Sequence, residues 1–90
     1  MTYQLTYHPD VKSDIAQFSR NIKDRIRKSI EERLLVDPIH YGDPLKKSLQ
    51  GFRKLRVGDY RVIYKIGKET IIIFKIGHRK EVYTTVRLLQ

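Results

Sequence analysis

Basic side chains that could bind an anion are concentrated in one stretch of this 90-residue chain. Residues 45–68 carry eight Lys or Arg and one acidic residue, Asp59, whereas residues 1–44 carry seven side chains of each sign. The formal net charge of +9 therefore comes from the second half. Because crowded like charges weaken the compact state, an acidic partner such as a nucleic acid is the natural explanation. A solvated basic surface without a specific ligand is the alternative.

Cleavage of an RNA phosphodiester is one reaction that such a stretch could perform. One group must take the proton from the 2′-hydroxyl, a second must stabilise the charge on the pentavalent phosphate, and a third must serve the departing 5′-oxygen. Histidine is the usual proton carrier, but the predicted strands offer lysine, arginine and tyrosine. His8, His40 and His78 lie far apart without companions at metal-ligand spacing, so we expect no metal. No phosphate-binding loop or dinucleotide fingerprint predicts a small-molecule cofactor.

The first half of the chain predicts one strand and two helices. Residues 2–7 alternate as in a half-buried strand, and residues 9–18 have helical spacing. An amphipathic helix is predicted over residues 21–36, because apolar residues recur there every four positions: Ile22, Ile26, Ile30 and Leu34. Asp37-Pro38 ends this helix. The two helices should form an antiparallel hairpin.

The second half predicts a loop followed by a three-stranded meander. Residues 37–51 contain two prolines and two glycines, and indicate a loop. The strands are predicted at 52–57, 60–66 and 70–76, with turns at Gly58-Asp59 and Gly67-Lys68. Residues 78–90 allow either a last strand or a short helix. The order βααβββ predicts a single α+β domain over residues 1–90, with the helical hairpin packed on one face of a mainly antiparallel sheet.

Strict alternation along these strands separates two faces of the sheet. The helix-facing set would be apolar: Leu55, Val57, Tyr60, Val62, Tyr64, Ile66, Ile72, Phe74 and Ile76. The opposite set would mix cations with isoleucines: Lys54, Arg56, Arg61, Ile63, Lys65, Ile71, Ile73 and Lys75. A cationic face left bare by the helices would suit RNA.

The remaining bulk features favour the cytoplasm. The chain has no cysteine, and its start lacks the charged and apolar pattern of a signal peptide. Its longest mainly apolar stretch, Thr70–Ile76, is far shorter than the ~20 residues that span a bilayer, so no membrane partner is expected.

Two segments resemble the C-terminal core of the RelE/ParE toxins. They are LQGFRKLRVGDYRVIY at Leu49–Tyr64 and GHRKEVY at Gly77–Tyr83. The length and the βααβββ order also match, so the resemblance covers essentially the whole chain. It implies a ribonuclease that enters the ribosomal A site and cuts messenger RNA during translation. It also implies a cognate antitoxin protein that binds and neutralises the toxin.

The resemblance assigns catalytic roles to Lys54, Arg61, Arg79 and Tyr83. Lys54 would be the general base, which requires an uncharged amine that neighbouring cations favour; a solvated strand lysine is the alternative. Arg61 would hold the phosphate through its planar fork, unless it forms a salt bridge to Asp59 or Glu81. Arg79 would protonate the leaving oxygen, or, because arginine is a very weak acid, would act on it mainly electrostatically. Tyr83 would stack on a base or orient the nucleotide, or else pack at the sheet edge.

Further RNA contacts are expected around these four residues: Lys46, Lys47, Phe52, Arg53, Arg56, Lys65, Lys75 and His78. The chain departs from the family at Phe52, where the first of a pair of family lysines is expected. Arg53 should point to the other face, so Arg56, Lys46 or His78 would have to replace the missing charge. Phe52 would instead stack on a base.

Two other functions share this fold or this charge. A ParE-like relative would inhibit DNA gyrase by binding, without catalysis, and the Phe52 substitution leans toward it. A basic RNA-binding module without cleavage is the third option. The combination of Lys54, Arg61, Arg79 and Tyr83 favours the ribonuclease.

Overall fold

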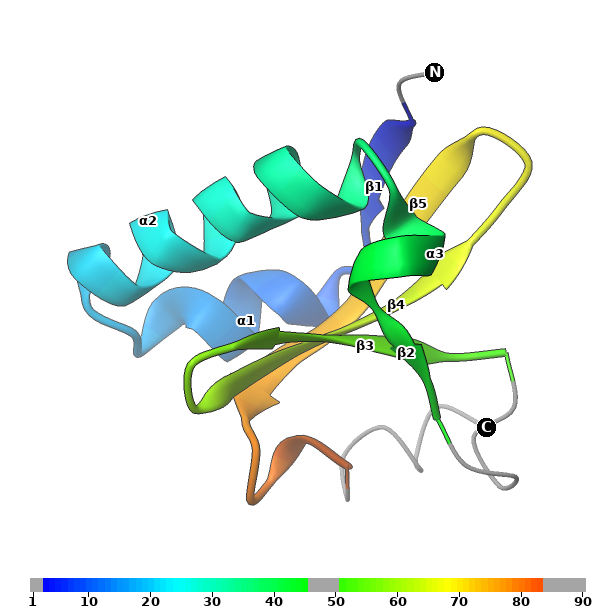
Figure 1. The fold of residues 1–90 in the computed structure, drawn as a ribbon. Helices are drawn as coiled ribbons and strands as arrows, with labels where there is room; N and C mark the ends of the chain where they lie inside the picture. Colours follow the sequence, from blue (N-terminus) through cyan, green and yellow to red (C-terminus); the bar gives the residue numbers. More distant parts are fainter. Residues whose placement is uncertain (1–2, 46–50, 84–90) are drawn as a thin grey trace.

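The computed structural model describes residues 3–45 and 51–83, which build a five-stranded sheet with two long helical segments on one face (Figure 1). The strands lie in the order β1-β5-β4-β3-β2, with β1 parallel to β5 and all other neighbours antiparallel. The elements are β1 (Gln4–Tyr7), α1 (Asp10–Ala16), α2 (Arg20–Ser29), η1 (Ile30–Leu34), α3 (Pro38–Tyr41), β2 (Asp43–Pro44), β3 (Arg53–Val57), β4 (Tyr60–Ile66) and β5 (Thr70–His78). The predicted α+β fold with a helical hairpin on the sheet is confirmed. No helix in the described ranges has the length and apolar character needed to cross a bilayer.

The second helix forms where the four-residue spacing predicted it. The Ser19 side chain caps its start by accepting a hydrogen bond from the Ile22 amide at 3.3 Å. The helix continues into the π-helical turn η1, where Leu35 N donates to Ile30 O at 3.1 Å. Residues spaced by four drift about 40° per step around an α-helix, and the wider π turn counters that drift. The apolar stripe therefore stays buried along its length, at Ile26, Ile30 and Leu34.

The segment predicted as a loop, residues 37–51, contains two short elements that sequence analysis missed. Asp37 accepts a hydrogen bond from His40 N at 3.1 Å and caps α3. β2 then adds a two-residue edge strand beside β3. Local signals cannot predict such short elements, because contacts with the rest of the fold hold them in place. The buried Tyr64 hydroxyl donates to Pro38 O at 2.6 Å, and one Arg53 nitrogen donates to the carbonyls of two residues of this segment.

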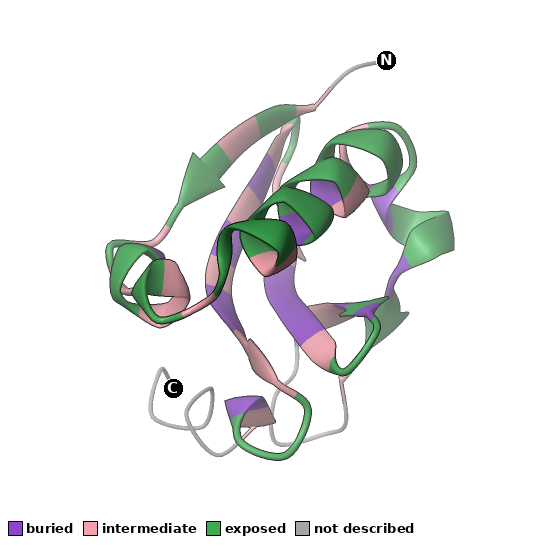
Figure 2. Cartoon of the chain, turned by 90° about the vertical axis from the view of Figure 1, so that its left-hand side faces the viewer, coloured by how far each residue is buried: buried purple, intermediate pink, exposed green. Residues whose placement is uncertain are grey.

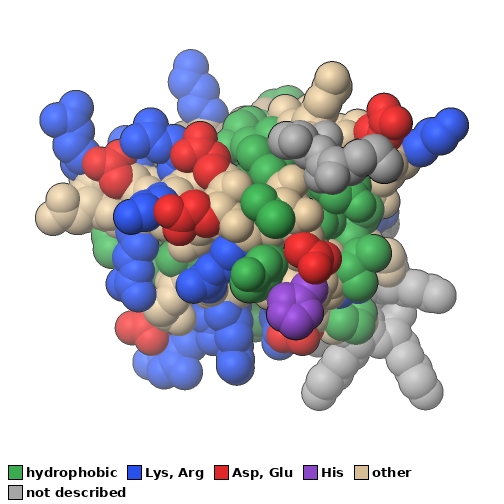
Figure 3. Space-filling view, turned by 45° about the horizontal axis from the view of Figure 1, so that its top comes forward, with side chains coloured by type: hydrophobic (Ala, Val, Ile, Leu, Met, Phe, Trp, Pro, Cys, Tyr) green, Lys and Arg blue, Asp and Glu red, His purple; other side chains and the backbone are tan. Residues whose placement is uncertain are grey.

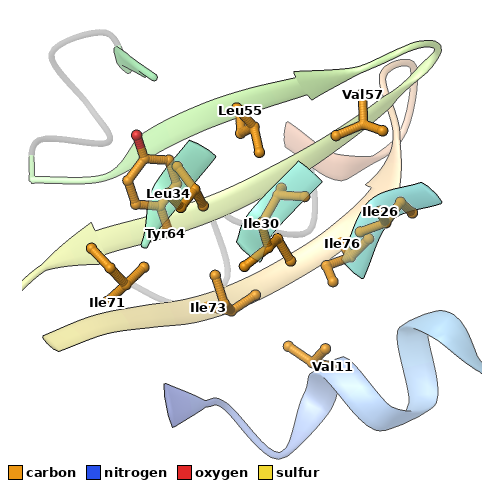
Figure 4. Close-up of a cluster of buried hydrophobic side chains, with 11 residues drawn as sticks. Val11, Ile26, Ile30, Leu34, Leu55, Val57, Tyr64, Ile71, Ile73 and Ile76 are labelled. Carbon is orange, nitrogen blue, oxygen red and sulfur yellow. The ribbon is translucent and has the colours of Figure 1, made fainter. Parts of the chain in front are cut away.

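The main hydrophobic core lies between the helices and one face of the sheet (Figure 4). The helical segments contribute Val11, Ile26, Ile30 and Leu34, and the strands contribute Leu55, Val57, Val62, Tyr64, Ile71, Ile73 and Ile76. Figure 2 shows the outward sides of the helices exposed and much of the central sheet buried. The helical hairpin thus covers one face of the sheet.

A β-bulge reverses the orientation of side chains in the first half of β5. The pairing of β4 with β5 shifts between Ile63 and Tyr64, which makes Phe74 an extra residue. Ile71 and Ile73 therefore join the main core, and Phe74 lies on the opposite face. Strict alternation predicted the reverse for these three residues and was wrong, because one inserted residue flips every side chain beyond it.

Sequence analysis predicted that the face away from the helices would be bare, and this prediction was wrong. A second cluster covers part of it, with Phe52, Ile63 and Val82 buried and with Leu45, Phe74 and Tyr83 partly buried. Val82 and Tyr83 are helical, so of the two forms allowed for this end of the chain the helix is the one seen there. Residues 84–90 lie outside the described ranges. The cations predicted for this face therefore surround a small apolar cluster instead of lining an open surface.

Candidate active site

Lys54 and Tyr83, two of the predicted catalytic residues, are in contact. Lys54 lies in β3 opposite Ile63 of β4 and is half-buried. Its Nζ lies 5.7 Å from the centroid of the Tyr83 ring, within the range of a cation–π attraction. Tyr83 also packs against the second cluster. The cluster thus holds the tyrosine ring where it meets the ammonium group.

Arg61 is buried and only partly satisfied. Its side chain lies in β4, and the residue is 7% exposed. Nη1 donates to the carbonyl oxygens of Gly58 and Tyr60, both at 2.9 Å, so the turn before β4 fixes the guanidinium group. Nε is buried and has no hydrogen-bond partner within residues 3–45 and 51–83. An unpaired buried donor is costly and therefore uncommon, which makes it a feature to explain at a candidate binding site.

Arg79 joins the same turn from the segment that follows β5. Its backbone N donates to Asp59 O at 2.8 Å, and its Nε lies 3.7 Å from Asp59 Oδ1. Both side chains are more than half exposed, so this ion pair is weak and easily opened. The Asp59 carboxylate, one predicted alternative partner of Arg61, faces Arg79 instead. Arg61 and Arg79 are thus both anchored to Gly58-Asp59.

Lys54 and Arg61 lie close together on the sheet face. Lys54 pairs with Ile63, and Arg61 lies two residues before Ile63 on the same face of β4, so Lys54 and Arg61 are diagonal neighbours. Diagonal neighbours in a sheet are about 7–8 Å apart between their α-carbons. Arg56 lies directly opposite Arg61 and is exposed. Like charges facing each other across strands repel, so this pair is better suited to holding an anion than to stabilising the empty fold.

Lys75 is a structural cation and not part of the RNA-binding surface predicted for it. Its side chain is 9% exposed, and Nζ lies 3.0 Å from Asp10 Oδ2 and 3.6 Å from Asp14 Oδ1. Asp14 also accepts a hydrogen bond from Ile76 N at 3.3 Å. The hydrogen bond from Lys75 lowers the pKa of the Asp10 carboxyl below its ordinary value. Sequence patterns do not reveal this link, because Asp10 lies 65 residues before Lys75 in the chain.

Phe52 and Arg53 also depart from their predicted roles. Phe52 is 4% exposed and packs edge-on against Phe74 at 5.2 Å, so it cannot stack on a nucleotide base. Arg53 points to the helix side, as alternation predicted, where its Nη2 donates to Ile39 O and Gly42 O at 2.9 Å. Both residues therefore pack within the fold, Phe52 in the second cluster and Arg53 against α3 and Gly42.

The other predicted contacts vary in their availability. Lys65 is half-buried, and its Nζ lies 4.3 Å from the Phe52 ring centroid, where it covers the second cluster. His78 is half-buried next to Tyr60, and its Nδ1 accepts a hydrogen bond from Lys80 N at 3.2 Å. Lys46 and Lys47 lie outside the described residues. Within the described ranges, no three His, Cys, Asp or Glu side chains group as metal ligands would.

Sequence analysis missed one cation at this site, Arg25 of α2. A Cβ atom placed on Gly58 would lie 3.1–3.3 Å from three atoms of the Arg25 guanidinium group, so that group rests against the turn. Arg25 lies on the polar side of an amphipathic helix, where a charged residue is ordinary, so the sequence pattern does not indicate its contact with Gly58. Only the packing of α2 beside the β3–β4 turn reveals it.

Comparisons with known proteins agree with this fold. A family model described as the ParE toxin of the type II toxin-antitoxin system, parDE, matches residues 5–83. Toxin RelE of Mycobacterium tuberculosis is 31% identical over 83 residues, which cover 86% of each chain. The chain therefore belongs to the RelE/ParE family of toxins of type II toxin-antitoxin systems.

More relatives and solved structures support the assignment. Toxin RelG of the same organism is 27% identical over 85 residues, covering 92% of this chain and 98% of the relative. A chain of the RelBE2 toxin-antitoxin complex of M. tuberculosis superposes with a TM-score of 0.82 at 25% identity, covering 90% of this chain and 95% of that one. A chain of the RelB-RelE complex of Methanococcus jannaschii gives a TM-score of 0.68 at 24% identity, covering 89% and 96%, and shows the shared fold.

Proposed function

We propose that this toxin is a ribosome-dependent endoribonuclease that cleaves messenger RNA in the A site and so inhibits translation. The state of Arg61 carries the proposal. Its guanidinium group is oriented by two carbonyls that both accept hydrogen bonds from Nη1. The buried Nε is closed to a ligand, so phosphate oxygens would bind the accessible edge of the group in a charge-assisted hydrogen bond. A preoriented donor of this kind is what stabilisation of a pentavalent phosphate requires.

In the proposed reaction the 2′-oxygen attacks the adjacent phosphorus and the bond to the 5′-oxygen breaks. Lys54 acts as the general base that takes the 2′-hydroxyl proton. Arg61 holds the non-bridging oxygens as their charge increases. Arg79, after leaving its weak pair with Asp59, stabilises the departing 5′-oxygen, which takes up a proton from water. The products are a 2′,3′-cyclic phosphate and a 5′-hydroxyl end.

Tyr83 is proposed to orient both Lys54 and the substrate. Its ring meets the lysine Nζ at 5.7 Å and is supported from behind by the second cluster. A tyrosine held in this way can stack on a base while it restricts the general base to one position. Productive geometry within hydrogen-bond reach matters as much as basicity for proton transfer.

The proposed partners are a cognate antitoxin, the ribosome and messenger RNA, which sets the proposed action in the cytoplasm. The solved relatives include toxin-antitoxin complexes from M. tuberculosis and M. jannaschii. A formal charge of +9 suits an acidic antitoxin as well as RNA, because complementary charge speeds association and excludes wrong partners. Antitoxin binding over Lys54 and Arg61 would block the substrate directly.

Gyrase inhibition by binding alone is the second candidate function, and two observations favour it. Phe52 takes the position of a family lysine and is buried in the second cluster, so that charge is absent from the site. In addition, the family model that matches this chain carries the description of the ParE toxin. Arg56 is exposed on the same face of β3 and is proposed to supply the missing charge.

Primer extension on messenger RNA after brief induction distinguishes the two functions. Wild type should cut within codons on translating ribosomes, and Arg61→Gln should lower the rate by about 10²–10³, the usual effect of removing one transition-state donor. Lys54→Gln tests the site without altering a buried group. Lys23→Gln, on the exposed surface of α2, is the matched control and should cut normally.

The gyrase hypothesis predicts the opposite result for messenger RNA cleavage. Growth arrest should then persist in Lys54→Gln, messenger RNA should stay intact, and DNA supercoiling by gyrase should stop. Circular dichroism of each variant separates loss of activity from loss of fold.

A further inference from the structure

The surface of α2 is positively charged, although residues 1–44 as a whole carry equal numbers of basic and acidic side chains. Five of its ten residues are basic and one, Asp24, is acidic. Figure 3 shows Lys and Arg side chains gathering over the N-terminal end of α2, at the left of the view, with acidic side chains between them. Arg27 pairs with Asp24 at 3.3 Å. Arg25, by contrast, has no hydrogen bond or ion pair within the described ranges.

Arg25 is held face-on against Gly58. The Cβ position of Gly58 lies 3.1 Å from Nη2, 3.2 Å from Nη1 and 3.3 Å from Cζ of Arg25. Nearly equal distances to three atoms of a planar group mean that its flat face meets the glycine. The N–H bonds lie in that plane, so they point sideways from the contact. Arg25 is exposed, and its donors are open to a ligand.

The same turn anchors the other two arginines of the site. Gly58 O accepts a hydrogen bond from Arg61 Nη1, and Asp59 O accepts one from Arg79 N. Three arginines from three different elements therefore converge on two residues, and the carboxylate of Asp59 lies 3.7 Å from one of them, Arg79. Planar guanidinium groups are the preferred side chains for binding phosphate.

We propose that Arg25 binds a second phosphate of the RNA strand, the neighbour of the phosphate that Arg61 holds. Both guanidinium groups lie against the single residue Gly58, so one strand that passes over this turn would meet both of them. The RNA strand then runs from the sheet face across the β3–β4 turn toward α2. The inference rests on the proposed function insofar as RNA is the ligand, and it adds a binding residue from the helical layer.

Gly58 has two features that make the contact possible. Its φ of +61° closes the two-residue turn between β3 and β4, which favours glycine over other residues. The missing side chain also leaves room for the guanidinium group, since any Cβ would be in tight contact with it. The turn that positions Arg61 is thus also the surface on which Arg25 rests.

Salt-dependent RNA binding tests the inference without requiring cleavage. The probe is a short fluorescein-labelled RNA with methylated 2′-oxygens, which cannot be cut, and anisotropy gives Kd over a series of KCl concentrations. Each phosphate contact contributes about 0.7 to the slope of log affinity against log salt for a single strand. Arg25→Gln should lower that slope by roughly 0.7. Arg25→Lys should restore the slope but only part of the affinity, because lysine lacks the flat face.

Lys23→Gln is the matched control, because it removes one charge from the opposite flank of the same helix, where Lys23 lines a cavity between α1 and α2. An unchanged slope for this control, with unchanged melting temperatures for all variants, supports a specific contact at Arg25. Equal slope losses for Arg25→Gln and Lys23→Gln, no loss for Arg25→Gln, or no binding by wild type would each overturn it. If the slope falls as expected but wild type cuts no messenger RNA, the proposed cleavage fails while the phosphate contact stands.

Discussion

Replacing Gly42 with alanine should destabilise this protein strongly, although the backbone at Gly42 is ordinary extended chain with φ of −114°. A Cβ atom there would overlap the Tyr64 hydroxyl and lie 2.7 Å from Cζ of the ring. Tyr64 cannot move freely, because it is fully buried and its hydroxyl donates to Pro38 O at 2.6 Å. Burial raises the pKa of this phenol, so it stays protonated and remains a donor.

The magnitude follows from two effects. Overpacking a dense core costs about 1–3 kcal/mol, and displacing the ring loses a buried hydrogen bond that contributes about 1 kcal/mol. Gly42→Ala should therefore lower the free energy of unfolding by about 3 kcal/mol, which in a domain of this size lowers Tm by roughly 12–24 °C. Gly67→Ala is the matched control, since its Cβ would make only ordinary contacts of 3.5–3.6 Å with Thr70.

A double-mutant cycle in urea tests the cause. Tyr64→Phe alone should cost about 1–3 kcal/mol, because Pro38 O loses its buried donor. In the double variant the overlapping hydroxyl is gone and its bond is lost only once, so the combined loss should be clearly smaller than the sum. Additivity within about 0.5 kcal/mol, or a Gly42→Ala loss no larger than that of Gly67→Ala, would refute the steric argument.

Three further predictions concern charges. Asp10 has its pKa lowered by Lys75 in the folded state, so its stabilisation is present above the unfolded pKa and is lost as pH falls through the folded value. Asp10→Asn should lower Tm at neutral pH but not in acid well below 3.8, and a constant difference across pH would contradict this. Arg56→Thr removes a like-charge pair with Arg61, so it should raise the unfolding free energy in urea by about 0.2–1 kcal/mol while weakening RNA binding; a loss of stability would count against the repulsion. Phe52→Lys restores the family's charge but buries it, so it should cost about 2–4 kcal/mol without raising cleavage in the primer-extension assay; faster cleavage would show that the site lacks this lysine.

The parts of the fold that sequence predicted are those set by local patterns. The four-residue spacing of Ile22, Ile26 and Ile30 located the second helix, and alternation around Gly58-Asp59 located the β3–β4 hairpin and its two-residue turn. These signals depend on neighbours in sequence, so they survive without knowledge of the tertiary structure. The fold class followed from the order of the elements.

The parts that sequence missed depend on contacts between distant segments. The bulge at Phe74 inverted the predicted faces of β5, and nothing in residues 70–76 announces an inserted residue. Lys75 looked like a surface cation because its carboxylate partners lie on α1. At the site, alternation placed Lys54 and Arg61 on one face and the family resemblance singled them out, but neither could reveal that Arg61 Nε is buried without a partner in the described structure.

The parallel pairing of β1 with β5 determines when the sheet of this toxin can be completed during synthesis. Gln4 pairs with Thr70, so the first strand has no neighbour until most of the chain has been synthesised. At about 5–20 residues per second, that delay is roughly 3–13 s. During this interval β1 has no partner strand, and the β3–β4 turn has no Arg79 beside it. The sheet and the group of arginines at the turn are therefore completed only after β5 and Arg79 have been synthesised.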